Sequence, residues 1–128
     1  MKLKDLIGYQ LVYIDETKII VKKGDKDYIL KIEEDSGDCC GFNEINSNLF
    51  ISKDEIEKNP VITNIEIIDD DSSNEYRDGH SVKITFYGNN KKLAELDSYS
   101  SSGSGWGYGA CVDIVCKELN IDETITSW

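Results

Sequence analysis

Short runs of β-branched and aromatic residues, separated by polar turns, fill most of the chain and predict β-strands. In the first third, the separating turns are only Asp15–Thr17 and Lys23–Lys26. A parallel crossover needs a dozen or more residues, so neighbours joined by such turns must pair antiparallel. The strands expected from this pattern span residues 10–14, 18–22, 28–33, 39–45, 61–68, 81–87, 93–97 and 110–116.

The clearest signal for a helix lies between residues 52 and 60. The residues from Ser52 to Glu55 read Ser-Lys-Asp-Glu, a capping box that opens a helix. Pro60 ends it, because the proline ring disfavours a helical conformation in the preceding residue. We therefore expect a short helix between these two signals.

The stretch Ala110–Leu119 fits both a helical and an alternating period. We favour a strand as far as Cys116, because three β-branched residues follow a glycine-rich segment. A short helical tail is expected over Ile121–Trp128. The chain is thus predicted to be a single α+β domain over residues 1–128, a predominantly antiparallel β-sheet of seven or eight short strands with one or two short helices.

Serine, glycine and aromatic residues make up nearly all of Ser98–Gly109, a composition typical of a loop. Its aromatic residues Tyr99, Trp106 and Tyr108 are the candidate binding residues, because rigid aromatics among small polar residues suit partner recognition. The alternative is a hairpin connection whose Trp106 packs back onto the core. Its glycines match the dinucleotide fingerprint, but polar residues separate them from the preceding strand, so no cofactor is expected.

The formal net charge is −11, from 25 acidic residues against 14 basic ones. This field repels phosphate backbones and anionic bilayers, which argues against direct nucleic-acid binding and against membrane binding. The first 20 residues carry charges that interrupt any export signal, and no run of 18 apolar residues occurs. We therefore expect a cytoplasmic protein.

The weak candidates for a metal site are the four cysteines, Cys39, Cys40, Cys111 and Cys116. Thiolates suit zinc. However, residues one or five apart on a strand point to opposite faces, so neither pair converges on one ion. We predict no metal and interpret the cysteines as reduced thiols in apolar surroundings. Redox chemistry or a disulfide remains the alternative.

His80, the only histidine, follows the acidic run Asp69–Asp71. An EF-hand loop beginning at Asp69 would need glycine at Asn74 and glutamate at His80. A hydrolase base would need a nucleophile and an orienting group, which the sequence does not place beside His80. We therefore predict a solvated turn and a surface histidine.

Leu6-Ile-Gly8, the strands that follow and Asp38-Cys39-Cys40 resemble a family of small uncharacterised proteins encoded by bacteriophages and prophages. In that family an Asp-Cys-Cys segment runs into a strand that ends in isoleucine, as Ile45 does here. Gly41 departs from the pattern, since the family usually has glutamate after the cysteine pair. The resemblance covers roughly residues 5–68. It implies a phage or prophage origin and a bacterial cytosol, and it carries no catalytic residue over.

The function expected from these observations is a non-enzymatic binding protein that acts on a host factor, with a protein or small-molecule partner. The alternative is an acidic mimic of nucleic acid, which would occupy a basic host site by its charge. The third class, a small metal- or thiol-dependent enzyme, lacks an acid, a base and a nucleophile that can be placed together.

Overall fold

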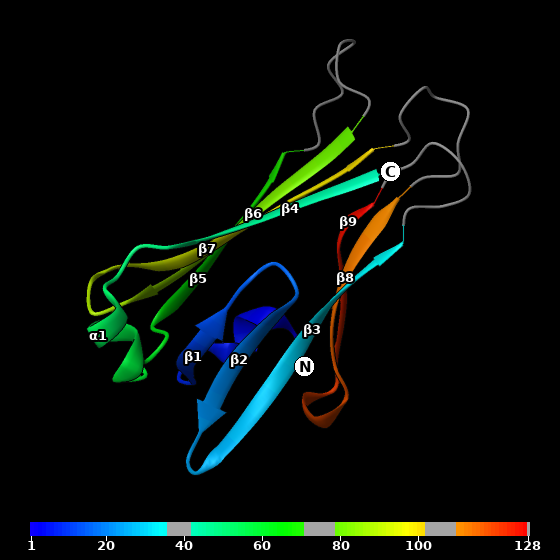
Figure 1. Ribbon diagram of the computed structural model, residues 1–128. Helices are drawn as coiled ribbons and strands as arrows, with labels where there is room; N and C mark the ends of the chain where they lie inside the picture. The colour runs from blue at the N-terminus through cyan, green and yellow to red at the C-terminus, as the bar shows by residue number, and fades with distance from the viewer. Residues whose placement is uncertain (36–41, 71–78, 102–109, 128) are drawn as a thin grey trace.

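The computed structural model describes residues 1–35, 42–70, 79–101 and 110–127, which form nine strands in two sheets (Figure 1). Every strand pairing is antiparallel, so the predicted fold class is confirmed. Sheet A has the order β1 (Gln10–Ile14), β2 (Lys18–Lys23), β3 (Lys26–Asp35), β8 (Cys111–Cys116) and β9 (Ile121–Ser127). Sheet B has the order β4 (Phe42–Leu49), β7 (Lys91–Ser101), β6 (Gly79–Gly88) and β5 (Asn64–Asp70).

Three short helical turns complete the described chain. They are the 3₁₀ turns η1 (Leu3–Leu6) and η2 (Lys117–Leu119) and the α-helix α1 (Lys53–Glu57). Ser52 caps α1 as predicted, because its Oγ accepts a hydrogen bond of 3.2 Å from the backbone N–H of Glu55. Within the described residues, no helix is long and apolar enough to cross a membrane.

The C-terminal segment is strand β9, so the predicted helical tail is wrong. Asn120, in the left-handed region with φ 56°, turns the chain from η2 into β9. A bulge between Val112 and Asp113 then shifts the register against β9. Ile125 and Thr126 are therefore both buried, which breaks the alternation by which a strand is recognised in a sequence.

Several other boundaries also differ from the prediction, among them the end of β4, which runs on to Leu49. Ser98–Ser101 belong to β7 and not to a loop, because tertiary hydrogen bonds outweigh the low strand propensity of serine. The strand expected over residues 61–68 begins only at Asn64, and Val61 forms an isolated bridge with Gln10. The ambiguous stretch forms a strand from Cys111 to Cys116, followed by η2.

The core lies between the two sheets. Sheet B contributes Ile84, Phe86 and Leu96, and sheet A contributes Leu11, Leu30 and Ile114, all fully buried. Leu3 and Leu6 of η1 join the same cluster. Burial alternates along β8 and most of β2, so sheet A has one face in the core and one outer face.

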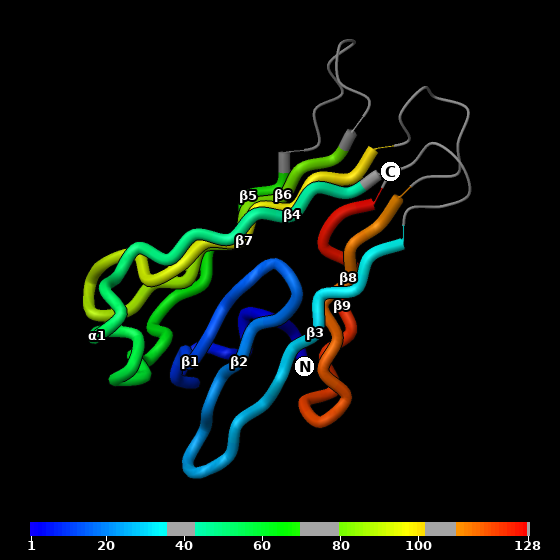
Figure 2. Tube along the Cα trace, in the orientation of Figure 1, coloured from blue at the N-terminus to red at the C-terminus, as the bar shows by residue number. Residues whose placement is uncertain are grey.

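Six strand ends lie at the same end of the molecule, as Figure 2 shows. They are the last residues of β3, β5 and β7 and the first residues of β4, β6 and β8. In sheet B, Ser101 is paired with both Phe42 and Gly79, and in sheet A, Asp35 is paired with Cys111. At the opposite side, segment 60–62 hydrogen-bonds along the free edge of β1 through Pro60 and Ile62.

Candidate binding faces

An apolar row crosses the outer face of sheet A. Tyr13, Ile20 and Ile29 are register partners on β1, β2 and β3, and Val115 on β8 is the partner of Lys31. Tyr13 and Ile29 are 42% and 49% exposed, and the half-buried Ile20 lies between them on β2. The row is therefore an apolar patch rather than a set of isolated exposed residues.

Lysines flank this row on both sides along the strands. Lys22 lies two residues from Ile20 in one direction and Lys18 two residues in the other, so all three share one face of β2. Two more lysines lie on the same side of the sheet, Lys31 on β3 and Lys117 on η2. The Lys18 ammonium lies 5.7 Å from the centroid of the Tyr13 ring, within range of a cation–π contact.

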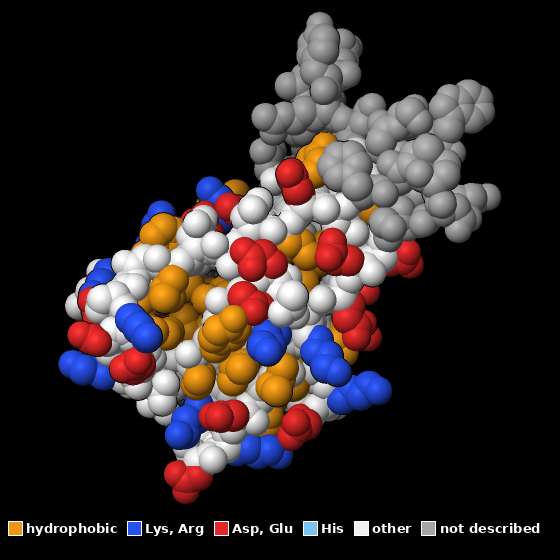
Figure 3. Space-filling view, viewed as in Figure 1, with side chains coloured by type: hydrophobic (Ala, Val, Ile, Leu, Met, Phe, Trp, Pro, Cys, Tyr) orange, Lys and Arg blue, Asp and Glu red, His pale blue; other side chains and the backbone are white. Residues whose placement is uncertain are grey.

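We call this surface the lysine face. It consists of Tyr13, Lys18, Ile20, Lys22, Ile29, Lys31, Val115 and Lys117. Figure 3 shows hydrophobic side chains gathered near the region of β1, β2 and β3, with lysines beside them.

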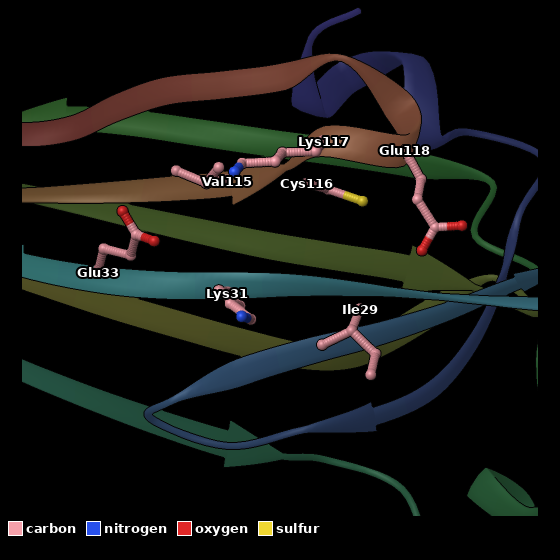
Figure 4. A pocket seen from close by; sticks show the side chains of 7 residues that line it. All are labelled: Ile29, Lys31, Glu33, Val115, Cys116, Lys117 and Glu118. Atoms are coloured by element: carbon pink, nitrogen blue, oxygen red, sulfur yellow. The ribbon is translucent and has the colours of Figure 1, made fainter.

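A hollow of about 350 Å³ opens on this face between β3 and β8. Its lining comprises Ile29, Lys31, Glu33, Val115, Cys116, Lys117 and Glu118. Figure 4 shows the three β3 side chains following one another along the strand, facing those of β8 and η2. Glu118 forms an ion pair of 2.8 Å with Lys26, so its charge is compensated within the chain.

The outer face of sheet B is acidic. Glu95 and Asp97 of β7 lie on it between Glu66 on β5 and Glu44 on β4. We call this surface the acidic face and include Tyr99, the register partner of Glu44. Glu95 is only 7% exposed and lies 3.7 Å from the Lys83 ammonium.

The carboxyl group of Asp97 is held in an unfavourable environment. Burial raises its pKa, and the charge of Glu95 and a hydrogen bond to that residue raise it further, while Lys83 offsets part of the effect. Desolvation and a neighbouring like charge both disfavour the ionised carboxylate. A cationic group placed over this pair would relieve that cost.

Of the three predicted binding residues, one lies in the described part of the chain and two lie outside it. Tyr99 is half-buried and lies on β7 rather than in a loop. Trp106 and Tyr108 lie outside the described residues.

His80 is not the surface histidine that we predicted. Its side chain is 16% exposed, and its Nε2 lies 2.6 Å from Asp69 Oδ1. Its Nδ1 accepts a hydrogen bond of 3.1 Å from the backbone N–H of Ser127, so the neutral ring carries its proton on Nε2. Both ring nitrogens are thus engaged in joining β6 to β5 and β9, and neither is directed to a nucleophile.

A chain of hydroxyl groups crosses the core beside His80. Ser100 Oγ donates to Asn43 Oδ1 at 2.7 Å and lies 2.7 Å from Thr126 Oγ1, which is 2.8 Å from Ser98 Oγ. Ser100 has one hydroxyl proton and gives it to Asn43, so Thr126 must donate to Ser100 and Ser98 must donate to Thr126. This ordered chain ties β7 of sheet B to β9 of sheet A.

The described cysteines, Cys111 and Cys116, are both free thiols. Cys111 is half-buried on the outer face of β8 and Cys116 is buried on the inner side. Burial raises the pKa of the Cys111 thiol, and the charges of Asp113 and Asp35 add to the shift. Cys39 and Cys40 lie outside the described residues. Across the described ranges, no group of three His, Cys, Asp or Glu residues could hold a metal ion.

Sequence reasoning missed the lysine face, although its signal is readable. Lys18, Ile20 and Lys22 alternate with the buried Ile19 and Val21. Apolar residues on both faces of a strand indicate that its outer face is also an interaction surface.

No family model, curated protein or solved structure matches this chain.

Proposed function

We propose that this protein is a non-enzymatic binding protein whose lysine face docks a partner protein. The observation that carries the proposal is the apolar row Tyr13–Ile20–Ile29, set in register across three strands, with Tyr13 and Ile29 exposed and Ile20 half-buried. Exposed apolar side chains that are contiguous and rimmed by polar ones are typical of interaction sites. The lysines supply that rim.

The resemblance of residues 5–68 to phage and prophage proteins directs the proposal to a bacterial host. In this setting the partner is a host factor in the cytoplasm, and the protein acts on it by occupancy rather than by chemistry. The engaged ring nitrogens of His80 agree with a role without catalysis.

The test is affinity capture from a bacterial lysate with two matched variants. Ile29→Glu places a charge in the apolar row, and Ile68→Glu makes the same change on the acidic face, where Ile68 is equally exposed at 49%. We expect Ile29→Glu to lose the captured partner and Ile68→Glu to keep it. Retention by both variants, or loss by both while their thermal unfolding is unchanged, would contradict the proposal.

The acidic face favours a second candidate function, that of a nucleic-acid mimic. Glu95 and Asp97 are spaced two residues apart on β7, so their carboxylates repeat about every 6.8 Å along one face. A mimic should bind a basic partner with an affinity that falls steeply with salt. Replacing Glu44, Glu66 and Asp97 by their amides should then abolish capture. The same charge change at Asp25, Glu57 and Asp122, which are exposed on the β2–β3 turn, on α1 and on β9, should not.

A further inference from the structure

Strand β5 is a free edge of sheet B. It pairs with β6 on one side only, so the backbone N–H and C=O groups of alternate residues point away from the sheet. Among the described residues, none of β5 takes part in a backbone hydrogen bond outside this pairing. An unpaired strand of seven residues is a template for one further strand.

The other edges of the two sheets are less open to pairing. Segment 60–62 covers β1, and Ile125 forms a bulge in β9, which interrupts its regular hydrogen bonding. On β4 the exposed side chains between residues 44 and 48 are all polar. Strand β5, by contrast, pairs without a bulge, contains neither lysine nor proline, and exposes Ile67 and Ile68 by 37% and 49%. It therefore lacks the features that keep a solvent-exposed edge from pairing.

A second hollow opens beneath this edge, on the inner side of sheet B. Its volume is about 390 Å³, and its lining includes Ile67 and Asp69 of β5, Val82 of β6 and residues 123–125 of β9. Side chains alternate between the two faces of a strand, so every second side chain of a strand added to β5 would point to the side where the hollow lies. The hollow admits a large apolar side chain, and an anchor of this kind typically contributes most to affinity.

The charged residues of β5 are all acidic. Asp69 is paired with His80, whereas Glu66 is exposed and has no hydrogen bond or ion pair to any described residue. Two copies of this chain joined through β5 would gather these carboxylates in one ribbon without a base on either strand, and like charges across strands are destabilising. A basic segment would instead neutralise Glu66.

The lysines near this edge do not neutralise Glu66. Lys83 on β6 lies 3.7 Å from the Glu95 carboxylate. Lys2 lines the hollow, where two carboxylates also lie. Each lysine therefore has a carboxylate of its own nearby, and together with Glu66 the carboxylates on and beside the edge outnumber the ammonium groups. The balance of charge at this edge is negative.

We infer that β5 takes up an extended segment of a partner protein as a further strand of sheet B, and that this segment alternates apolar and basic residues. The apolar residues face the hollow, and a basic residue lies beside Glu66. This inference goes beyond the proposed function, because β5 belongs to sheet B whereas the lysine face belongs to sheet A, so either can fail without the other.

The test measures, by fluorescence anisotropy, how labelled synthetic peptides of seven residues, the length of β5, bind the full chain. The parent peptide alternates lysine and leucine. Two derivatives carry N-methyl groups on alternate backbone nitrogens, at the lysines in one and at the leucines in the other. Only one of these two sets of N–H groups faces β5 in an added strand. We therefore expect one derivative to bind at least tenfold more weakly than the parent and the other to bind as the parent does.

A peptide with glutamate in place of lysine tests the charge, and it should also bind at least tenfold more weakly than the parent. Matched protein variants locate the binding. Ile67→Lys places a charge at the hollow and should weaken binding of the parent peptide about tenfold. Leu49→Lys makes the same kind of change on β4, the opposite edge of sheet B, where Leu49 is 44% exposed, and should leave binding unchanged.

Equal binding of the two N-methyl derivatives, full binding of the glutamate peptide, or no binding of the parent peptide overturns the inference. None of these measurements depends on the folding of a variant. Full binding by Ile67→Lys overturns the inference as well. A dimer in sedimentation velocity that Ile67→Lys separates would identify a second copy of the chain as the occupant of the edge, which also contradicts the inference.

Discussion

Replacing Thr126 by valine tests the hydroxyl chain that joins the two sheets. Valine keeps the shape of threonine but can neither accept the proton of Ser98 nor donate to Ser100. Ser100 keeps Asn43 as its partner, so its loss is one hydrogen bond, worth about 1 kcal/mol. Ser98 is buried and loses this acceptor, which costs about 1–3 kcal/mol in desolvation.

Together these effects should lower the free energy of unfolding by about 2–4 kcal/mol. For a chain of 128 residues this corresponds to a fall in Tm of about 10 °C. The assay is urea unfolding, followed by circular dichroism, of the single variant and of Thr126→Val with Ser98→Ala. The double variant should be more stable than Thr126→Val alone, because it no longer buries the Ser98 hydroxyl without an acceptor. A change below about 0.5 kcal/mol in the single variant, or a double variant less stable than it, would refute the proton order derived for the chain.

Three further substitutions address other contacts. Gly88→Ala should cost about 2–3 kcal/mol in urea unfolding, because the new Cβ would collide with the carbonyl oxygen of Val61 and lie 2.7 Å from Leu93 Cδ1. Asp15, whose pKa is held well below its usual range by hydrogen bonds from Tyr13 and Thr17, gives stability that is present above about pH 4 and lost as the pH falls toward its folded pKa. Asp15→Asn should therefore cost about 1–2 kcal/mol at pH 7 and flatten the acid limb of stability measured between pH 2 and 5. The pH dependence that Asp97 contributes is opposite to that of Asp15. Because the pKa of Asp97 is raised in the folded state, its ionisation lowers stability as the pH rises through that pKa. Asp97→Asn should therefore raise Tm at pH 7, and the increase should vanish in acid.

The strands built on short-range alternation could be predicted from the sequence. Lys18–Lys23 carries β-branched residues between polar turns, and the structure places its boundary within one residue of the prediction. The capped start of α1 could also be predicted, because the capping hydrogen bond joins Ser52 to Glu55, only three residues further along the chain. Local physics was sufficient for these elements.

Elements that depend on distant partners could not be predicted. The serines of β7 form a strand because Thr126 reaches them from β9, with Ser98 and Thr126 28 residues apart in sequence. The bulge opposite Ile125 hides the alternation of β9 itself. The lysine face likewise exists only once the register brings Tyr13, Ile20 and Ile29 into one row.

The first turn of the chain is completed by its last strand. Leu3 and Leu6 are fully buried, and the backbone N–H of Leu3 donates to Glu123 of β9 at 3.2 Å, across 120 residues of sequence. A ribosome adds roughly 5–20 residues per second, so about 6–24 seconds pass between the synthesis of these two contact partners. During translation the hydrogen bond from Leu3 therefore cannot form until β9 has been synthesised, so for that interval the apolar turn η1 lacks part of its native packing.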